Sequence, residues 1–154
     1  MLITLYLVSS GLLVKPSLYL SAFFEQYRQQ YYDYLSRART HNDLGQWLKF
    51  FLEGIWQTSE NSIQTFKAII ALRTECERQV ITLGKKTKLA QAALQLLFSK
   101  PIVDGQDLAA ALEVNISTAF RLIDDLVRLG ILRESTGLKR NRVFVFQKYV
   151  ALFE

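Results

Sequence analysis

The stretch STGLKRNRVFVF, Ser135 to Phe146, is the most informative one in this chain of 154 residues. Segments rich in strand formers, ILRES and RVFVF, lie on the two sides of a short turn. The turn carries three cations and an amide, Lys139, Arg140, Asn141 and Arg142. The stretch therefore predicts a C-terminal β-hairpin with a positively charged tip.

Three short helices are predicted before this hairpin, over residues 89–98, 105–112 and 116–129. Asp104 and Asn115 are good N-caps for the second and third helices, and Gly130 is a good terminator for the third. Three helices and a two-stranded ribbon, in this order, are typical of a winged helix-turn-helix. We therefore expect this fold for residues 88–154.

In a winged helix-turn-helix the third helix enters the major groove of DNA and the ribbon contacts the backbone. The expected DNA-binding residues are those on the outward start of this helix and those of the basic turn, namely Ser117, Thr118, Arg121, Lys139, Arg140, Asn141 and Arg142. Arg121 is suited to a bidentate base contact, and the turn cations are suited to phosphates.

A solvated hairpin with no ligand is the alternative interpretation of the basic turn. Asp124 and Asp125 would repel DNA if they faced it, and the net charge from residue 88 onward is only +2. Winged helices also serve as protein-interaction modules, so a protein partner stays open.

The residues before this region predict an all-helical part over residues 1–84. Apolar side chains at steps of three and four indicate a helix over residues 20–38. The same pattern over residues 47–80 indicates either one long helix or two that join near Ser59. Residues 2–14 carry no charge and predict an apolar helix that ends near Gly11. We expect this helix to be covered by the rest of the chain, by a second copy or by another protein.

The composition excludes several classes of function. Cys76 and His41 are the only residues of their kinds, which argues against a metal site, a disulfide framework and histidine-based catalysis. The uncharged N-terminal segment lacks the basic n-region of a secretory signal peptide, and it is too short to span a bilayer. We expect a cytoplasmic protein with no cofactor, no metal and no membrane partner. The net charge of +5 permits a nucleic-acid partner without requiring one.

Five segments, taken in order, resemble the C-terminal half of Fic family proteins that carry a winged-helix tail. They are LITLYLVSSGLL (2–13), PSLYLSAFFEQYRQQYYDYL (16–35), WLKFFLEGI (47–55), LLFSKPIV (96–103) and TGLKRNRVFVF (136–146). The resemblance runs over nearly the whole chain. It implies a mainly α fold, in which a partial Fic-type helical bundle is followed by a winged helix-turn-helix with a C-terminal β-hairpin.

The Fic family transfers AMP from ATP to a hydroxyl group of a target protein. Its signature is a loop HPFxxGNGRxGR, in which the histidine is the base and the glycine-rich turn cradles phosphates. This sequence contains no His-Pro-Phe and no Gly-Asn-Gly, and the resemblance places Met1 just inside the helix that follows that loop. No catalytic residue of the family therefore has a counterpart here, and we expect a protein that is not itself an enzyme.

Three functions are compatible with these observations. The first is a non-catalytic Fic-like C-terminal module with DNA-binding or regulatory character. The second is part of an AMP-transferase that needs an upstream Fic half, bound through the apolar helix 2–14. The third is a protein–protein interaction module whose hairpin recognises a target protein.

Overall fold

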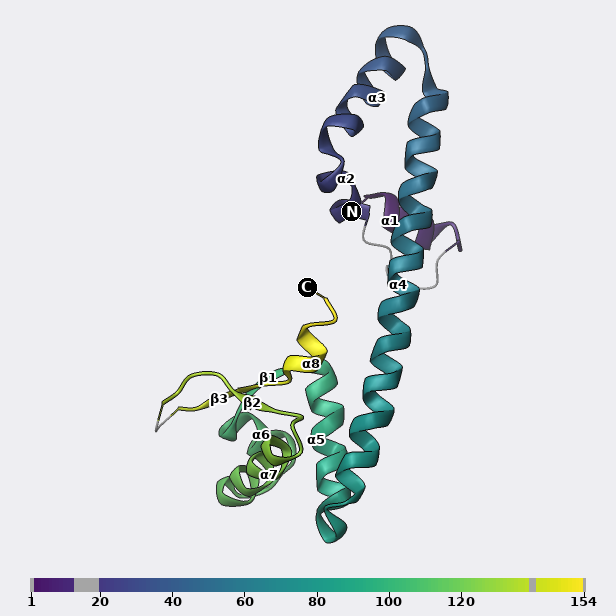
Figure 1. Cartoon of the computed structure of the whole chain (residues 1–154). Helices are drawn as coiled ribbons and strands as arrows, with labels where there is room; N and C mark the ends of the chain where they lie inside the picture. Colours follow the sequence, from purple (N-terminus) through teal and green to yellow (C-terminus); the bar gives the residue numbers. More distant parts are fainter. Residues whose placement is uncertain (1, 13–19, 139–140, 154) are drawn as a thin grey trace. The chain divides into compact units, whose positions relative to one another are not determined.

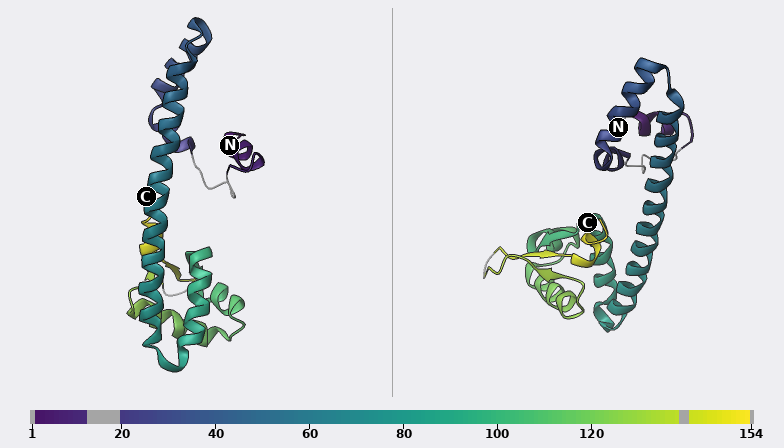
Figure 2. Two further views of the ribbon diagram at one scale, coloured as in Figure 1. Left: turned by 90° about the vertical axis from the view of Figure 1, so that its right-hand side faces the viewer. Right: turned by 45° about the horizontal axis from the view of Figure 1, so that its top comes forward.

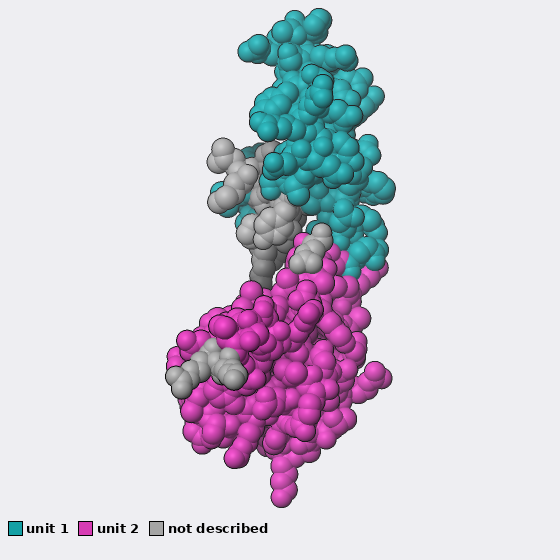
Figure 3. Space-filling model, turned by 60° about the vertical axis from the view of Figure 1, so that its left-hand side comes forward, with its two compact units in different colours: residues 1–64 teal, residues 65–154 magenta. Residues whose placement is uncertain are grey.

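The structure is a computed structural model that describes residues 2–12, 20–138 and 141–153. The chain is mainly α-helical, as predicted, with a small antiparallel sheet near its C-terminus (Figure 1). It divides into two compact units, residues 1–64 and residues 65–154 (Figure 3). None of the helices in the described ranges is both long and apolar enough to cross a membrane.

The first unit contains α1 (Leu2–Ser9), α2 (Leu20–Gln26), α3 (Arg28–His41) and the start of α4 (Leu44–Ile81). The helix predicted over residues 20–38 is in fact two helices, because the backbone of Tyr27 leaves helical geometry with φ −108° and ψ 34°. The connection from α3 to α4 is also shorter than predicted. Asn42 ends α3 in the left-handed conformation, with φ 51°, so the chain reverses within two residues.

Aromatic side chains fill the space between α2, α3 and α4 in the first unit. Phe23 is buried, and its ring centroid lies 5.1 Å from that of Phe50 and 4.8 Å from that of Tyr27. A Cβ atom on Gly54 would lie 2.6 Å from two atoms of the Phe23 ring. Glycine at this position therefore permits the close approach of α2 to α4.

α4 is one continuous helix from Leu44 to Ile81, which decides between the two alternatives left open by the sequence. In the second unit it is followed by η1 (Gly84–Lys86), α5 (Thr87–Ser99), β1 (Ile102–Asp104), α6 (Gly105–Ala111) and α7 (Ile116–Arg128). The chain then forms β2 (Arg133–Glu134), β3 (Val143–Val145) and α8 (Gln147–Val150).

The sheet has three strands in the order β1-β3-β2, and both pairs are antiparallel. The sequence predicted only the two strands β2 and β3. The structure adds a third strand, β1, at the free edge of β3. The backbone N–H of Phe146 donates to the carbonyl of Pro101 at 2.8 Å, and Val103 lies opposite Phe144. Val103 and Phe144 are both buried, so the added strand closes one side of the core.

The core of the second unit lies between α5, α6, α7 and the sheet, which Figure 2 shows from two further directions. Leu97, Leu108, Ile123 and Phe146 are fully buried there. Cys76 also belongs to this core, at 1% exposure. Asp104 caps α6 in a complete capping box with Asp107, as its position before the apolar run predicted.

Candidate nucleic-acid interface

The start of α7 is fixed by its N-cap, which holds the predicted base-reading residues in place. Asn115 adopts an extended conformation, and its side-chain oxygen accepts a hydrogen bond from the backbone N–H of Thr118 at 2.8 Å. The hydroxyl of Ser117 donates to the same oxygen at 2.8 Å. Ser117 is exposed and Thr118 is half-buried. Of these two predicted contact residues, Ser117 is therefore the more accessible.

Arg121 lies one helical turn beyond Ser117 and is exposed. Residues seven and eleven positions after Ser117 lie on the same face of the helix as Ser117 and Arg121, so this face also presents Asp124 and Arg128. Among the residues that the structure describes, none forms an ion pair with Arg121. No carboxylate in the described ranges therefore competes with an anionic ligand or a base for the guanidinium group of Arg121.

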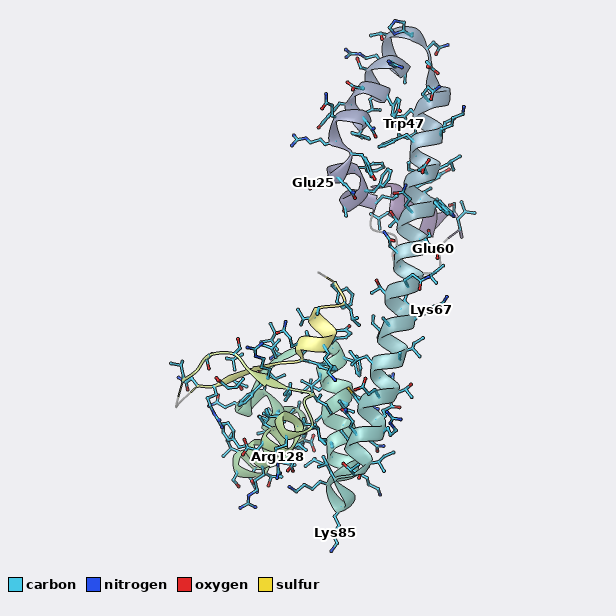
Figure 4. The ribbon with its side chains drawn as sticks, viewed as in Figure 1. Glu25, Trp47, Glu60, Lys67, Lys85 and Arg128 are labelled. Carbon is cyan, nitrogen blue, oxygen red and sulfur yellow. The ribbon has the colours of Figure 1, made fainter. Side chains whose placement is uncertain are left out.

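Asp125 is buried at 3% exposure, in contrast to its neighbour Asp124. Its carboxylate accepts hydrogen bonds from Lys86 in η1 and from Arg128 at the end of α7, whose side chain Figure 4 labels. Burial raises the pKa of Asp125, but the hydrogen bond and charge of Lys86 and the charge of Arg128 outweigh burial and bring the pKa below its ordinary value. The carboxylate is therefore ionised at neutral pH and is compensated by two cations.

This arrangement changes the electrostatic argument made from the sequence. Only Asp124 contributes an uncompensated negative charge to the exposed face of α7 within the described residues. Lys86 pairs with the Asp125 carboxylate from 39 positions earlier in the chain, a contact that no local sequence pattern indicates.

The base of the hairpin is organised by Glu134, which the sequence did not single out. Its carboxylate accepts hydrogen bonds from the Thr136 hydroxyl, from the backbone N–H of Thr136 and from the N–H of Gly137, where φ is 64°. The Thr136 hydrogen bond is the main reason why the pKa of Glu134 lies below its ordinary value. In the sequence, this hydrogen-bonded turn was indicated only by an acidic residue directly before Ser-Thr-Gly.

The described part of the basic turn consists of Asn141 and Arg142, whereas Lys139 and Arg140 lie outside the described residues. Asn141 is exposed and takes the left-handed conformation with φ 53°, which asparagine tolerates well. Arg142 is half-buried, with its Cζ atom 5.8 Å from the ring centroid of Phe120 and 5.2 Å from that of Phe144. These distances are within the range of a cation–π interaction.

Arg142 therefore links the hairpin to α7, because Phe120 belongs to α7 and Phe144 to β3. A Cβ atom on Gly105 would lie 2.4 Å from the Phe120 ring, so α6 also packs closely against this aromatic residue. The sequence reasoning missed Phe120. Its place between Ser117 and Arg121 on the predicted helix was the only signal that it borders the outward face.

The single histidine and the single cysteine of the chain, His41 and Cys76, belong to different compact units. No group of three or more His, Cys, Asp or Glu residues in the described part of the chain is placed to hold a metal ion. Burial raises the pKa of the Cys76 thiol to about 11, which suppresses the reactive thiolate near neutral pH. His41 is exposed at the end of α3, with its Nδ1 atom 2.7 Å from the hydroxyl of Thr40.

The sequence matches no known protein-family model.

Proposed function

We propose that this chain is a non-catalytic, Fic-like C-terminal module whose residues 88–154 form a winged helix-turn-helix that binds double-stranded DNA. Two features of the second unit support the fold assignment. The order α5, β1, α6, α7, β2, β3 is that of a winged helix, and the three antiparallel strands provide the small sheet of such a domain. α7 then takes the place of the recognition helix and the hairpin takes the place of the wing.

The observation that carries the functional proposal is the position of Arg142 over the rings of Phe120 and Phe144. This contact places Arg142, the last residue of the basic turn, beside α7. When a guanidinium group stacks on a ring through its flat face, the N–H groups at its edge stay available to donate hydrogen bonds to a phosphate. Arg142 therefore acts as a positioning residue for the hairpin and as a phosphate ligand.

The charges of the proposed surface favour an anionic ligand. Arg121, Arg142 and the predicted turn residues Lys139 and Arg140 supply positive charge, and the carboxylate of Asp125 is already compensated. Three to four phosphate contacts give an expected slope of about −3 for the logarithm of affinity against the logarithm of salt concentration. This slope corresponds to a loss of about 60- to 100-fold in affinity between 50 and 200 mM salt.

The proposal is tested by titrating a fluorescently labelled duplex at 50 and 200 mM salt. Arg142→Ala should weaken binding evenly across duplex sequences and should lower the magnitude of the salt slope by about one. Lys148→Ala is the matched control, because Lys148 pairs with Glu75 at 3.2 Å and lies outside the proposed surface. No binding of the full chain at 50 mM salt, or an equal loss in both variants, would refute the proposed DNA surface.

A protein target is the second candidate, and the exposed apolar residues of the same elements favour it. Leu138, before the tip of the hairpin, is 56% exposed, and Ile116, at the start of α7, is 44% exposed. Apolar side chains of this kind are typical of protein-interaction surfaces and contribute little to phosphate contacts. A protein-binding function predicts that Leu138→Ser abolishes capture of the partner, whereas the DNA-binding function predicts an unchanged duplex affinity for this variant.

A further inference from the structure

Asp124 lies at the centre of the exposed face of α7. An α-helix turns by about 100° per residue, so residues seven positions apart point in directions that differ by only about 20°. Asp124 therefore points with Ser117, on the side of the helix opposite to its buried residues. Those buried residues are Ala119, Leu122, Ile123, Asp125 and Leu126. A ligand that receives this face of α7 therefore meets the carboxylate of Asp124.

The carboxylate of Asp124 has no ion-pair partner among the residues that the structure describes. Arg128, four positions further on, donates to Asp125 instead. Arg121, three positions earlier, is exposed and likewise forms no described ion pair. The exposed face thus presents a group that only donates hydrogen bonds beside a group that only accepts them.

The hydroxyl of Ser117 has less freedom than these two groups. It donates its hydrogen to the side-chain oxygen of Asn115 at 2.8 Å, which leaves it as an acceptor. Thr118 is half-buried, and its backbone N–H is taken up by the same oxygen. Arg121 and Asp124 are therefore the two side chains of this face that are best suited to select a base.

The central position of Asp124 decides which part of a DNA duplex it would reach. The major groove admits one α-helix, with base edges on its floor and phosphates along its rims. A side chain at the centre of the inserted face meets base edges, whereas side chains at the flanks of that face meet phosphates. A carboxylate held there must find a hydrogen-bond donor, because a buried acceptor without a partner is costly.

The bases differ in what they offer to a carboxylate in the major groove. Guanine presents two acceptors, and thymine presents an acceptor and a methyl group, so neither can donate to Asp124. Adenine has a donor at N6, but its N7 acceptor lies beside that donor and opposes a carboxylate. Cytosine presents the N4 amino group, which makes it the best partner for Asp124.

We propose that α7 reads G·C base pairs in the major groove, with Asp124 accepting from N4 of cytosine and Arg121 donating to N7 and O6 of guanine. This sequence preference rests on the proposed DNA binding and adds the identity of the bases to it. The two residues are separated by about 4.5 Å along the helix axis, which is close to the spacing of about 3.4 Å between base pairs. The cytosine and the guanine therefore belong to the same base pair or to neighbouring pairs.

The experiment is the selection of binding sites by the full chain from duplexes with a randomised core, at about 50 mM salt. The selected duplexes should share one position that prefers cytosine and one that prefers guanine. Exchange of either base should weaken binding by about 5- to 100-fold. Replacement of the guanine by 7-deazaguanine keeps base pairing but removes N7, so it should weaken binding of the natural chain and not of Arg121→Ala.

Asp124→Asn separates base reading from simple repulsion of phosphates. An asparagine side chain accepts from N6 and donates to N7 of adenine, so the variant should prefer adenine where the natural chain prefers cytosine. Asp33→Asn is the matched control, because it removes the same charge from an exposed position of the first unit. This control should leave the base preference unchanged, and circular dichroism checks that each variant is folded.

Three outcomes would overturn the G·C preference. Binding of duplexes without any base preference would refute it and leave the proposed DNA binding intact. An even gain in affinity of Asp124→Asn for all duplexes, with the cytosine preference retained, would show that Asp124 only repels phosphates. Absence of binding to any duplex would refute the DNA-binding function itself, and the base preference with it.

Discussion

Replacement of Asp125 by asparagine tests how the buried charge of α7 is compensated. The side chain keeps its shape and an acceptor oxygen, but it loses the negative charge that Lys86 and Arg128 approach. Hydrogen bonds to a charged group contribute about 1.5–3 kcal/mol and neutral ones about 0.5–1.5 kcal/mol. Lys86 is 50% exposed and Arg128 is 75% exposed, so solvent screening reduces the difference. We expect Asp125→Asn to lower the free energy of unfolding by about 1–2 kcal/mol at pH 7.

The pH dependence of this loss provides a second readout. The folded-state pKa of Asp125 is lowered, so the ion pairs stabilise the protein fully above the unfolded-state pKa, which is near 3.9. As the pH falls through the folded-state pKa, Asp125 becomes protonated and its contribution disappears. Urea unfolding curves of the natural chain and of Asp125→Asn should therefore differ at pH 7 and converge at low pH.

Asp124→Asn is the control for this experiment, since Asp124 neighbours Asp125 but is exposed. Its stability should stay within about 0.5 kcal/mol of the natural chain, as for most surface substitutions. An Asp125→Asn variant that is as stable as the natural chain at pH 7 would refute the argument. A loss that stays constant down to pH 2.5 would also refute it, because that loss would not come from the charge.

Three further predictions concern other parts of the chain. Gly54→Ala should destabilise the first unit by about 1–2 kcal/mol in urea unfolding, because the new methyl group meets the buried Phe23 ring at 2.6 Å; Gly45→Ala, whose nearest atom is 3.7 Å away, should not. The Cys76 thiol, with its pKa of about 11, should react with a thiol reagent at pH 8 only after unfolding, and rapid labelling of the folded protein would contradict its burial. Incubation of the chain with labelled ATP should leave it unmodified, whereas strong self-labelling would refute the non-catalytic proposal.

Local signals in the sequence determined most of the helical architecture. Asp104 and Asn115 cap α6 and α7 as predicted, because a cap is a contact between a side chain and a backbone group only three residues away. Gly130 follows α7 with φ 68°, as expected for a residue that ends a helix. The two strands of the hairpin were also predicted from a local signal, because strand-forming residues flank a turn within one short segment. The predicted contact residues of the turn and of α7 remain predictions.

Only the tertiary structure decided which distant residues meet. The third strand β1 depends on where Ile102 and Val103 reach the edge of β3, and three residues after a proline carry too little pattern to reveal that pairing. Lys86, one of the two partners of Asp125, is 39 residues away from it in sequence, and the rings that Arg142 contacts come from two elements. Sequence periodicity assigns a residue to a face of its own helix or strand, whereas the path of the whole chain decides what lies opposite that face.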